Sequence, residues 1–292
     1  MGSIILLFHI FDYQNIRLNM PNDISILLSR YKELNLQDVL DHERFNEYAI
    51  VHHSCSIEGS TLTEVETRLL LEEDLTPKGK PLTHSLMVKD HYAALRYVLE
   101  AAAEKKAISV DFIQKINAFV MKNTGGIYNT VFGEIDATKG MFRKGNVSAG
   151  GSYFPNYDKV IPYSTDLVKR LDENLQKVQG DEEQLKLSFS AHFDLVSIHP
   201  FYDGNGRTSR LLMNYIQAYH RLPLAIVFKE DKADYYVALQ ETRKQEDMQI
   251  FYAFMFGQYR KHLEQEIASY TQAMSQKTEP RKGKGSGYSL FF

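Results

Sequence analysis

The feature that most constrains the fold of this chain is a succession of segments with apolar residues at helical spacing. Residues 41–57 place their apolar side chains near one stripe, and residues 109–123 begin at Ser109, a residue type that caps helix N-termini. Residues 164–178 follow the same pattern, with Ser164 as the expected N-cap. Further helices are expected over 61–73, with Thr63 and Glu66 as a capping box, and over 90–105, 184–198, 208–220, 233–245 and 248–267. The sequence therefore predicts a mainly α fold.

The pattern changes between Gly133 and Tyr163. This stretch is rich in Gly, is interrupted by Pro and has no 3.6-residue period, so we expect an extended hairpin or flap. We expect the basic residues of its "FRKGN" segment, Arg143 and Lys144, to be solvated, as well as those of the Gly-rich tail. The simplest partition is an N-terminal helical region over 1–90, a core over 91–262, and a helix end with a flexible tail over 263–292.

The composition narrows the class of protein. The chain has 292 residues and a net charge of −3, so no basic field points to nucleic acid or to an anionic membrane. The single cysteine, Cys55, cannot form an internal disulfide and favours a reducing compartment, which we take to be the cytoplasm. The apolar run "SIILLFHIF" is too short to span a bilayer and lacks the flanking features of a signal peptide. We expect it to be a buried strand or an extension ahead of a start at Met20.

The stretch "SIHPFYDGNGRTSR", Ser197 to Arg210, combines features of a phosphate site. Gly204 and Gly206 allow positive φ and a close approach of the backbone to a ligand. Successive N–H groups in such a turn, followed by a helix N-terminus, attract anions. Arg207 and Arg210, three residues apart, are expected to point toward the same space and can hold phosphate oxygens in bidentate fashion.

The same loop carries a carboxylate and an imidazole. Asp203 is an odd residue beside phosphates unless a Mg²⁺ ion bridges the two. His199 follows the apolar helix and can act as a general base near neutral pH. The loop is thus interpreted as a nucleotide-phosphate cradle with a metal ligand and a base.

Other interpretations of the loop fit less well. An EF-hand is excluded because Arg207, Thr208 and Asn214 stand at ligand or turn positions, and the P-loop pattern is absent. Gly204-Asn205-Gly206 begins a dinucleotide-binding pattern, but no third Gly follows and no strand precedes it. A plain helix connection with a capping Asp would suffice for "DGNG" alone, but not for its combination with a His before it and two Arg after it.

The stretch "HPFYDGNGRTSR" resembles the signature of the Fic family, H-P-F-x-D/E-G-N-G-R-x-x-R, with every specified position filled. The resemblance covers roughly residues 45–261 and implies a Fic-fold helical bundle with a β-hairpin flap. It also implies transfer of AMP from ATP–Mg²⁺ to a protein hydroxyl. By family roles, His199 deprotonates the target Ser, Thr or Tyr, Asp203 holds Mg²⁺, and Arg210 takes the γ-phosphate. The signature residues assigned to phosphate binding are Gly204, Asn205, Gly206 and Arg207.

A second motif, "SCSIEG" from Ser54 to Gly59, resembles the inhibitory motif of this family, [ST]-x-x-x-E-[GN]. Its position implies the subclass in which an inhibitory helix precedes the Fic core. A carboxylate at a helix C-terminus interacts unfavourably with the helix dipole, so a cationic partner is expected beside it. If Glu58 pairs with Arg210, Arg210 is unavailable to the γ-phosphate. The alternative is a solvated Glu before a Gly cap, and in some family members the same Glu supports removal of AMP from the target.

Two further parts of the site are expected from the same resemblance. The flap, whose edge would align an extended segment of the target by strand addition, comprises Ala149, Gly150, Gly151 and Ser152 and extends to Phe154. Tyr235 and Tyr236, with Leu239, lie on the helix that resembles the adenine-pocket wall, although aromatic residues at that spacing are also typical of a core. His192 is expected to be a packed or hydrogen-bonded residue, and His52 and His53 lack partners at zinc spacing.

The function predicted from the sequence is an autoinhibited protein adenylyltransferase that uses ATP and Mg²⁺ and acts on a protein substrate. Self-modification and a homodimer stay open, and no nucleic-acid or membrane partner is expected. The alternatives are a Fic-fold enzyme that uses another nucleotide donor or mainly removes AMP from its target, and a non-catalytic module gated by nucleotide.

Overall fold

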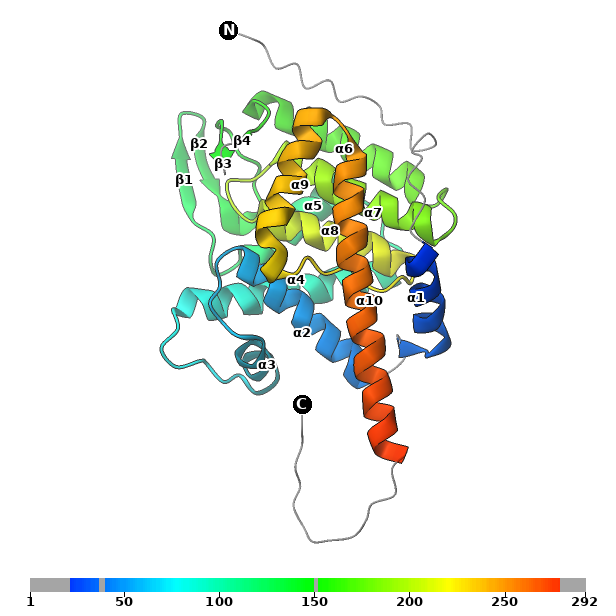
Figure 1. The fold of residues 1–292 in the computed structure, drawn as a ribbon. Helices are drawn as coiled ribbons and strands as arrows, with labels where there is room; N and C mark the ends of the chain where they lie inside the picture. The colour runs from blue at the N-terminus through cyan, green and yellow to red at the C-terminus, as the bar shows by residue number, and fades with distance from the viewer. Residues whose placement is uncertain (1–21, 37–39, 150–151, 279–292) are drawn as a thin grey trace.

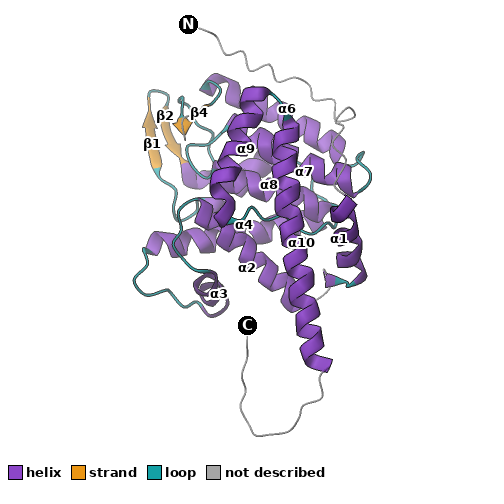
Figure 2. Cartoon of the chain, in the orientation of Figure 1, coloured by secondary structure: helices purple, strands orange, loops and turns teal. Residues whose placement is uncertain are grey.

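A computed structural model describes residues 22–36, 40–149 and 152–278 of the chain (Figure 1). The predicted mainly α fold is confirmed, since helices dominate this part of the chain (Figure 2). The helices are α1 (Asn22–Glu33), α2 (Leu40–Ile57), α3 (Glu64–Glu73), α4 (Leu82–Ala103), α5 (Val110–Val120), α6 (Val160–Leu175), α7 (Asp181–Ile198), α8 (Asn205–Tyr219), α9 (Lys232–Gln245) and α10 (Met248–Thr278). Short 3₁₀ helices are η2 (Ala137–Lys139), η3 (Tyr157–Lys159) and η4 (Lys229–Asp231). The apolar run at residues 3–11, Met20 and the basic tail lie outside the described residues.

Helices α7 and α8 form the centre of the bundle. Every residue of α7 from Leu185 to Ile198 is buried, and α8 is buried along most of its length. Helices α4 and α5 pack against α8, α6 and α10 pack against α7, and α2 packs against α4. The loop at 199–204 that joins α7 to α8 is therefore held between two helices with little freedom to shift. Among the described residues, no helix combines the length and the apolar character that crossing a membrane requires.

Capping residues predicted from the sequence explain where two helices begin. The Oγ atom of Ser109 accepts a hydrogen bond from the backbone N–H of Phe112 at 3.1 Å, which caps α5. Thr63 and Glu66 form the predicted capping box, with the Thr63 hydroxyl and the Glu66 carboxylate each accepting from the other's backbone N–H, which fixes the start of α3.

The prediction that Ser164 caps a helix is wrong. Helix α6 begins earlier, at Val160, directly after η3, and Ser164 is buried inside it. Pro162 stands in the first turn of α6 and is compatible with this earlier start. Backbone N–H groups there have no acceptor within the helix, so a proline does not interrupt it.

The strands form two small antiparallel hairpins on one side of the bundle in this view (Figure 1). Strands β1 (Ile127–Thr130) and β2 (Gly133–Asp136) make one hairpin, and β3 (Ser148–Ala149) and β4 (Ser152–Tyr153) make the other. The predicted extended segment is thus present, although its first strand begins before Gly133. Tyr128 of β1 stacks on Tyr202 of the α7–α8 loop, with 4.6 Å between ring centroids, which attaches the first hairpin to this loop.

Candidate active site

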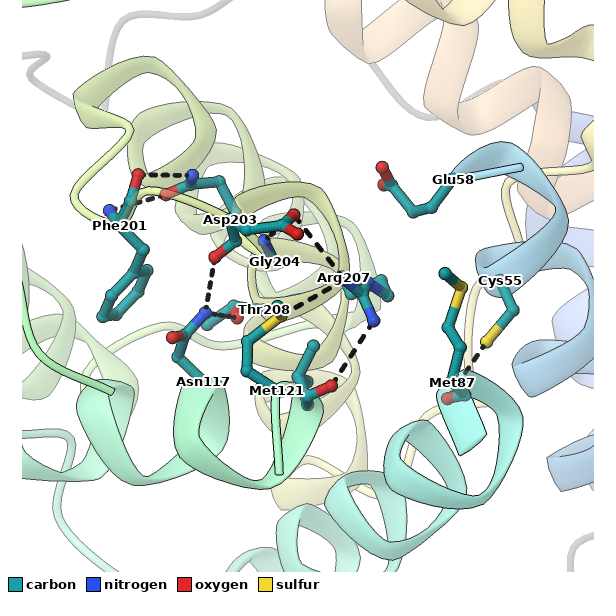
Figure 3. Close-up of polar contacts among 12 residues, drawn as sticks. Cys55, Glu58, Met87, Asn117, Met121, Phe201, Asp203, Gly204, Arg207 and Thr208 are labelled. Carbon is teal, nitrogen blue, oxygen red and sulfur yellow. Dashed lines mark hydrogen bonds and ion pairs between the residues drawn. The ribbon is translucent and has the colours of Figure 1, made fainter. Parts of the chain in front are cut away.

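The backbone of the α7–α8 loop is fixed by polar contacts that the sequence places at its two ends. His199 closes α7 in the left-handed region, with φ of 52°, and its N–H donates to the Leu195 carbonyl at 3.0 Å. Gly204 takes the N-cap of α8 with φ of 77°. The Asn205 amide accepts from the N–H of Phe201 and donates to its carbonyl, both at 2.9 Å (Figure 3). The side chain of Asn205 therefore closes the loop on itself.

Helix α5 holds the same loop from below. The Asn117 amide nitrogen donates to the Asp203 carbonyl at 3.1 Å and to the Thr208 hydroxyl at 3.0 Å (Figure 3). One side chain thus joins the last part of the loop to the first turn of α8. The site has no room for a side chain at position 204, because a Cβ added to Gly204 would lie 2.8 Å from Asn117 Nδ2.

The imidazole of His199 is arranged as a proton acceptor. Its Nδ1 atom lies 3.3 Å from the Val196 carbonyl, which can only accept, so Nδ1 carries the hydrogen and Nε2 carries the free lone pair. The ring stacks on Phe154, with centroids 3.8 Å apart and planes 16° apart. Burial lowers the pKa of His199 to about 4, an effect larger than that of the hydrogen bond to Val196. The ring is therefore neutral at physiological pH.

A cavity of about 440 Å³ opens beside His199. Arg210 lines it from α8 and Glu58 lines it from the segment that follows α2. Ser152 and Phe154 contribute from the flap side. The other lining residues are Val196, Gly206, Lys232, Tyr235, Tyr236, Leu239, Gln240 and Arg243. The cavity thus brings the neutral imidazole of His199 and the buried guanidinium of Arg210 to one space.

Arg210 donates hydrogen bonds to the end of α2 and to Glu58 just beyond it. Its Nε atom donates to the Ser54 hydroxyl at 2.8 Å, and its Nη2 atom donates to the Ser54 carbonyl at 3.1 Å and to Glu58 Oε1 at 2.7 Å. The Arg210 side chain is 4% exposed and that of Glu58 is 28% exposed. Burial raises the pKa of the Glu58 carboxyl, but the Arg210 and Arg207 guanidinium groups outweigh it and hold that pKa below its ordinary value. The predicted pairing of Glu58 with Arg210 is present in the structure.

The expectation that Arg207 and Arg210 point toward the same space is wrong, since the two side chains take different directions. Arg207 donates to the Val120 carbonyl at 3.4 Å and to the Met121 sulfur at 3.2 Å, both at the end of α5 (Figure 3). Its Nη2 atom lies 3.7 Å from Asp203 Oδ1. Arg207 is thus buried behind the loop and does not line the cavity, whereas Arg210 does.

Gly206 lies where the loop approaches Glu58 most closely. A Cβ atom at this position would lie 2.4 Å from Glu58 Oε1 and 3.1 Å from Arg210 Nη1. The absence of a side chain therefore makes room for the ion pair, as well as for any phosphate that replaces the carboxylate.

The residues expected in the flap and the adenine wall are only partly brought together. Ser152 lines the cavity, Ala149 does not, and the flap residues Gly150 and Gly151 lie outside the described residues. Tyr235 lines the cavity but is 1% exposed, and its hydroxyl lies 2.7 Å from His192 Nε2. Tyr236 is 41% exposed. The expectation that His192 is a hydrogen-bonded core residue is confirmed.

Sequence reasoning missed two groups of residues at the site. The expectation that Arg143 is solvated is wrong: its side chain is buried and donates to three main-chain carbonyls, whereas Lys144 is exposed as predicted. The other missed residues are Lys232, Gln240 and Arg243. Together with Tyr236 they recur along α9 at spacings of three or four residues, from Lys232 before it to Gln240 and Arg243 after it, and this helical recurrence is the signal that could have found them.

Comparisons with known proteins agree with this geometry. Residues 107–217 match the family model described as the Fic/DOC family. The protein adenylyltransferase Fic of Drosophila grimshawi is 31% identical over 188 residues, which cover 64% of this chain and 36% of the relative. That of Aedes aegypti is 32% identical over 192 residues, which cover 65% of this chain and 36% of the relative. The chain therefore spans about a third of the length of these curated relatives.

A solved structure shares the fold. The crystal structure of a Fic-domain-containing signaling protein from Bacteroides thetaiotaomicron has a TM-score of 0.73 with this chain at 22% identity, and the match covers 86% of this chain and 98% of that one. The matched family residues include the entire α7–α8 loop with His199 and Arg210. Over residues 107–217, then, this chain carries a domain of the Fic/DOC family.

Proposed function

We propose that this chain is an autoinhibited protein adenylyltransferase that transfers AMP from ATP to a hydroxyl group of a target protein. The observation that carries the proposal is the contact of Arg210 with Glu58 at 2.7 Å in the cavity that His199 also lines. The names of the relatives, the complete loop signature and the neutral His199 support the same chemistry.

The proposed reaction uses His199 as a general base. Its Nε2 lone pair takes the proton of the target hydroxyl while the hydroxyl oxygen attacks the α-phosphorus of ATP. A bond forms between that oxygen and the α-phosphorus, the bond from the α-phosphorus to the bridging oxygen breaks, and pyrophosphate leaves. Because such a displacement needs mainly positioning and neutralisation of charge, the backbone N–H groups at the start of α8 and Arg210 supply most of what is needed.

Asp203 is the residue that would hold Mg²⁺. Its side chain is 54% exposed and Oδ1 accepts from the Gly204 N–H at 2.5 Å. Mg²⁺ prefers hard oxygen ligands and in nucleotide sites usually takes one or two carboxylates together with phosphates and waters. Within the described residues, no group of three His, Cys, Asp or Glu side chains gathers, so a site with one carboxylate fits this donor set. A bound ion would neutralise the charge of the phosphates.

The proposed inhibition follows from the competition for one guanidinium group. Glu58 and the γ-phosphate are both anions that Arg210 can bind, and Arg210 cannot satisfy both. With Glu58 in place, ATP would bind without the contact that sets its γ-phosphate, and the α-phosphorus would not stand in line with the attacking oxygen.

Mass spectrometry of intact protein and of peptides tests the proposal. Wild type, Glu58→Gly and Glu58→Gly/His199→Ala are each incubated with ATP and Mg²⁺, alone and with a cell extract. Glu73→Gly is the matched control, because Glu73 also ends a helix but is exposed on α3 and remote from the cavity. We expect added AMP only in Glu58→Gly, on itself or on a target.

The alternatives make different predictions in the same experiment. Absence of AMP transfer from Glu58→Gly, despite ATP binding, contradicts the proposal. A competition panel of nucleotides then distinguishes another donor, and loss of AMP from a pre-modified target identifies AMP removal as the main activity. An unchanged cellular effect of His199→Ala would favour a non-catalytic module gated by nucleotide.

A further inference from the structure

Arg143 is a buried cation whose donors all go to the main chain. It lies between η2 and β3 and is 2% exposed. Its Nε donates to the His199 carbonyl at 2.7 Å, Nη1 to the Gly145 carbonyl at 2.8 Å and Nη2 to the Pro155 carbonyl at 2.6 Å. In addition, its own N–H donates to the Pro200 carbonyl at 2.9 Å.

The charge of Arg143 has no carboxylate partner within the described part of the chain. Burial lowers its pKa, and Tyr202 acts in the opposite direction. A buried guanidinium without a counter-ion is costly, so its retention requires a compensating set of acceptors. Three carbonyl oxygens at short distances provide that set, and each belongs to a different segment around the active site.

These three segments are the two ends of the flap and the residue that acts as base. Gly145 precedes β3 and Pro155 follows β4, so the Arg143 guanidinium closes the base of this hairpin. A second tie lies beside it, where the Asn146 amide oxygen accepts from the Tyr157 N–H at 2.9 Å. Phe154, next to Pro155, stacks on the imidazole of His199.

The third acceptor stands at a strained position. His199 adopts φ of 52°, a left-handed conformation that residues with a side chain seldom adopt because Cβ then lies close to a carbonyl oxygen. Its carbonyl points to Arg143 and not along α7, so the hydrogen bond from Nε helps to hold this conformation. The orientation of the imidazole depends directly on that backbone.

We propose that Arg143 is a positioning residue that fixes the main chain of His199 to both ends of the β3–β4 hairpin, so that the general base and the strand that meets the target are held as one unit. This rests on the proposed function for the role of the base. Because a displacement of about 1 Å in a reacting group can lower a rate about 100-fold, such a brace has a direct effect on turnover. Arg143 does not line the nucleotide cavity, so it acts on the acceptor side of the reaction.

The test compares Arg143→Gln and Arg143→Lys, made in the Glu58→Gly protein, with Lys144→Gln. Lys144 is the adjacent basic residue and is exposed, so its variant controls for loss of one positive charge in this segment. We expect kcat for AMP transfer to fall about 100-fold in Arg143→Gln, with the KM for ATP unchanged and Lys144→Gln unaffected. Arg143→Lys retains the charge but cannot reach three carbonyls in a fixed fork, so it should also lose kcat.

A second readout needs no activity. In protein labelled with ¹⁵N-histidine, the signal of His199, assigned with His199→Ala, reports the pKa of the imidazole. Arg143 is one of the groups that lower this pKa, so Arg143→Gln should raise it and Arg143→Lys should leave it low. A merely structural role would lower the folded fraction without separating these two variants.

The outcomes separate the two proposals. An unchanged His199 titration in Arg143→Gln, or a kcat equal to that of Lys144→Gln, overturns the role of Arg143. A shifted titration together with the absence of AMP transfer from Glu58→Gly itself leaves the brace intact and contradicts the proposed function instead.

Discussion

Glu58 and Arg210 are 152 positions apart in the sequence, and their side chains meet at 2.7 Å across the cavity. The contact joins the end of α2 to the first turns of α8, and helices α3 to α7 lie between these two elements in the chain. One ion pair therefore links the part of the chain before the Fic/DOC match, residues 107–217, to the loop within it.

Glu58→Gln removes the charge of this contact while it keeps the shape of the side chain. Arg210 is 4% exposed, so the loss of its charged partner should lower the free energy of unfolding by about 2 kcal/mol. ATP should restore more stability to this variant than to wild type, because its phosphates replace the carboxylate. Urea denaturation with and without ATP measures both effects, and Glu73→Gln serves as control. Equal stabilisation of variant and wild type by ATP would contradict the competition for Arg210.

Gly206→Ala tests the close approach of the loop to Glu58. In a helix, Ala is otherwise favoured over Gly by about 0.5–1 kcal/mol, but here its Cβ would lie 2.4 Å from Glu58 Oε1. We expect the substitution to destabilise wild type and to cost at least about 1 kcal/mol less in the Glu58→Gly background. A double-mutant cycle by urea denaturation gives this coupling. Strictly additive effects would mean that Gly206 and Glu58 do not compete for space.

Gly204→Ala and Gly79→Ala form a matched pair, because the two glycines have nearly the same positive φ. These angles are 77° and 76°, but a Cβ at 204 would meet Asn117 and Met121, whereas a Cβ at 79 would meet nothing within 4 Å. Gly79→Ala should cost about 1–2 kcal/mol from strain alone. Gly204→Ala should cost about 1–3 kcal/mol more and should also impair AMP transfer, because the loop must shift. Thermal unfolding and the transfer assay in Glu58→Gly protein check the pair; equal costs would show that packing under the loop is loose.

The depressed pKa of His199 predicts how activity depends on pH. Because burial lowers this pKa to about 4, the base stays neutral as the pH falls from 7 to about 5, and the rate of Glu58→Gly should be flat over that range. Below about pH 4 the rate should fall about tenfold per pH unit. Phe154→Ala, which uncovers the ring, should move this acidic limb to higher pH.

The same group affects stability with a defined sign. The folded pKa of His199 lies below its ordinary value of 6.5, so between about pH 6.5 and 4 the unfolded chain binds the extra proton. The contribution of His199 to stability is therefore complete above pH 6.5 and is lost as the pH falls toward 4. By contrast, an acidic limb near pH 6.5 in the rate of AMP transfer by Glu58→Gly would contradict the buried, neutral imidazole.

Much of the helical framework could be predicted from the sequence because its signals are local. Ser109 and the pair Thr63–Glu66 cap their helices through contacts within three residues, which a pattern can encode. The prediction for Ser164 was wrong because Ser also occurs inside helices, and α6 begins four residues earlier, with Pro162 in its first turn. The residues of the α7–α8 loop could be predicted because they are close together in the sequence, at the spacing that a phosphate-binding turn before a helix requires.

Long-range contacts of the site were less accessible. Glu58 was linked to Arg210 through a family resemblance, since nothing local pairs residues so distant in sequence. The burial of Arg143 had no local signal, because its acceptors are main-chain carbonyls, which every residue possesses. The ring contact of Phe154 with His199 likewise depends on how the flap folds back, and periodicity does not report that.

The way α2 ends bears on how the contact between Glu58 and Arg210 could be broken. Val51, Cys55 and Ile57 are at most 1% exposed, so the end of α2 is packed into both hydrophobic clusters. Glu58 stands just beyond the last helical residue, held by the bond from its N–H to the Cys55 carbonyl, and Gly59 follows with φ of 102°. Under the proposed inhibition, a rotation of the main chain at Gly59 would move the Glu58 carboxylate away from Arg210 without a displacement of α2.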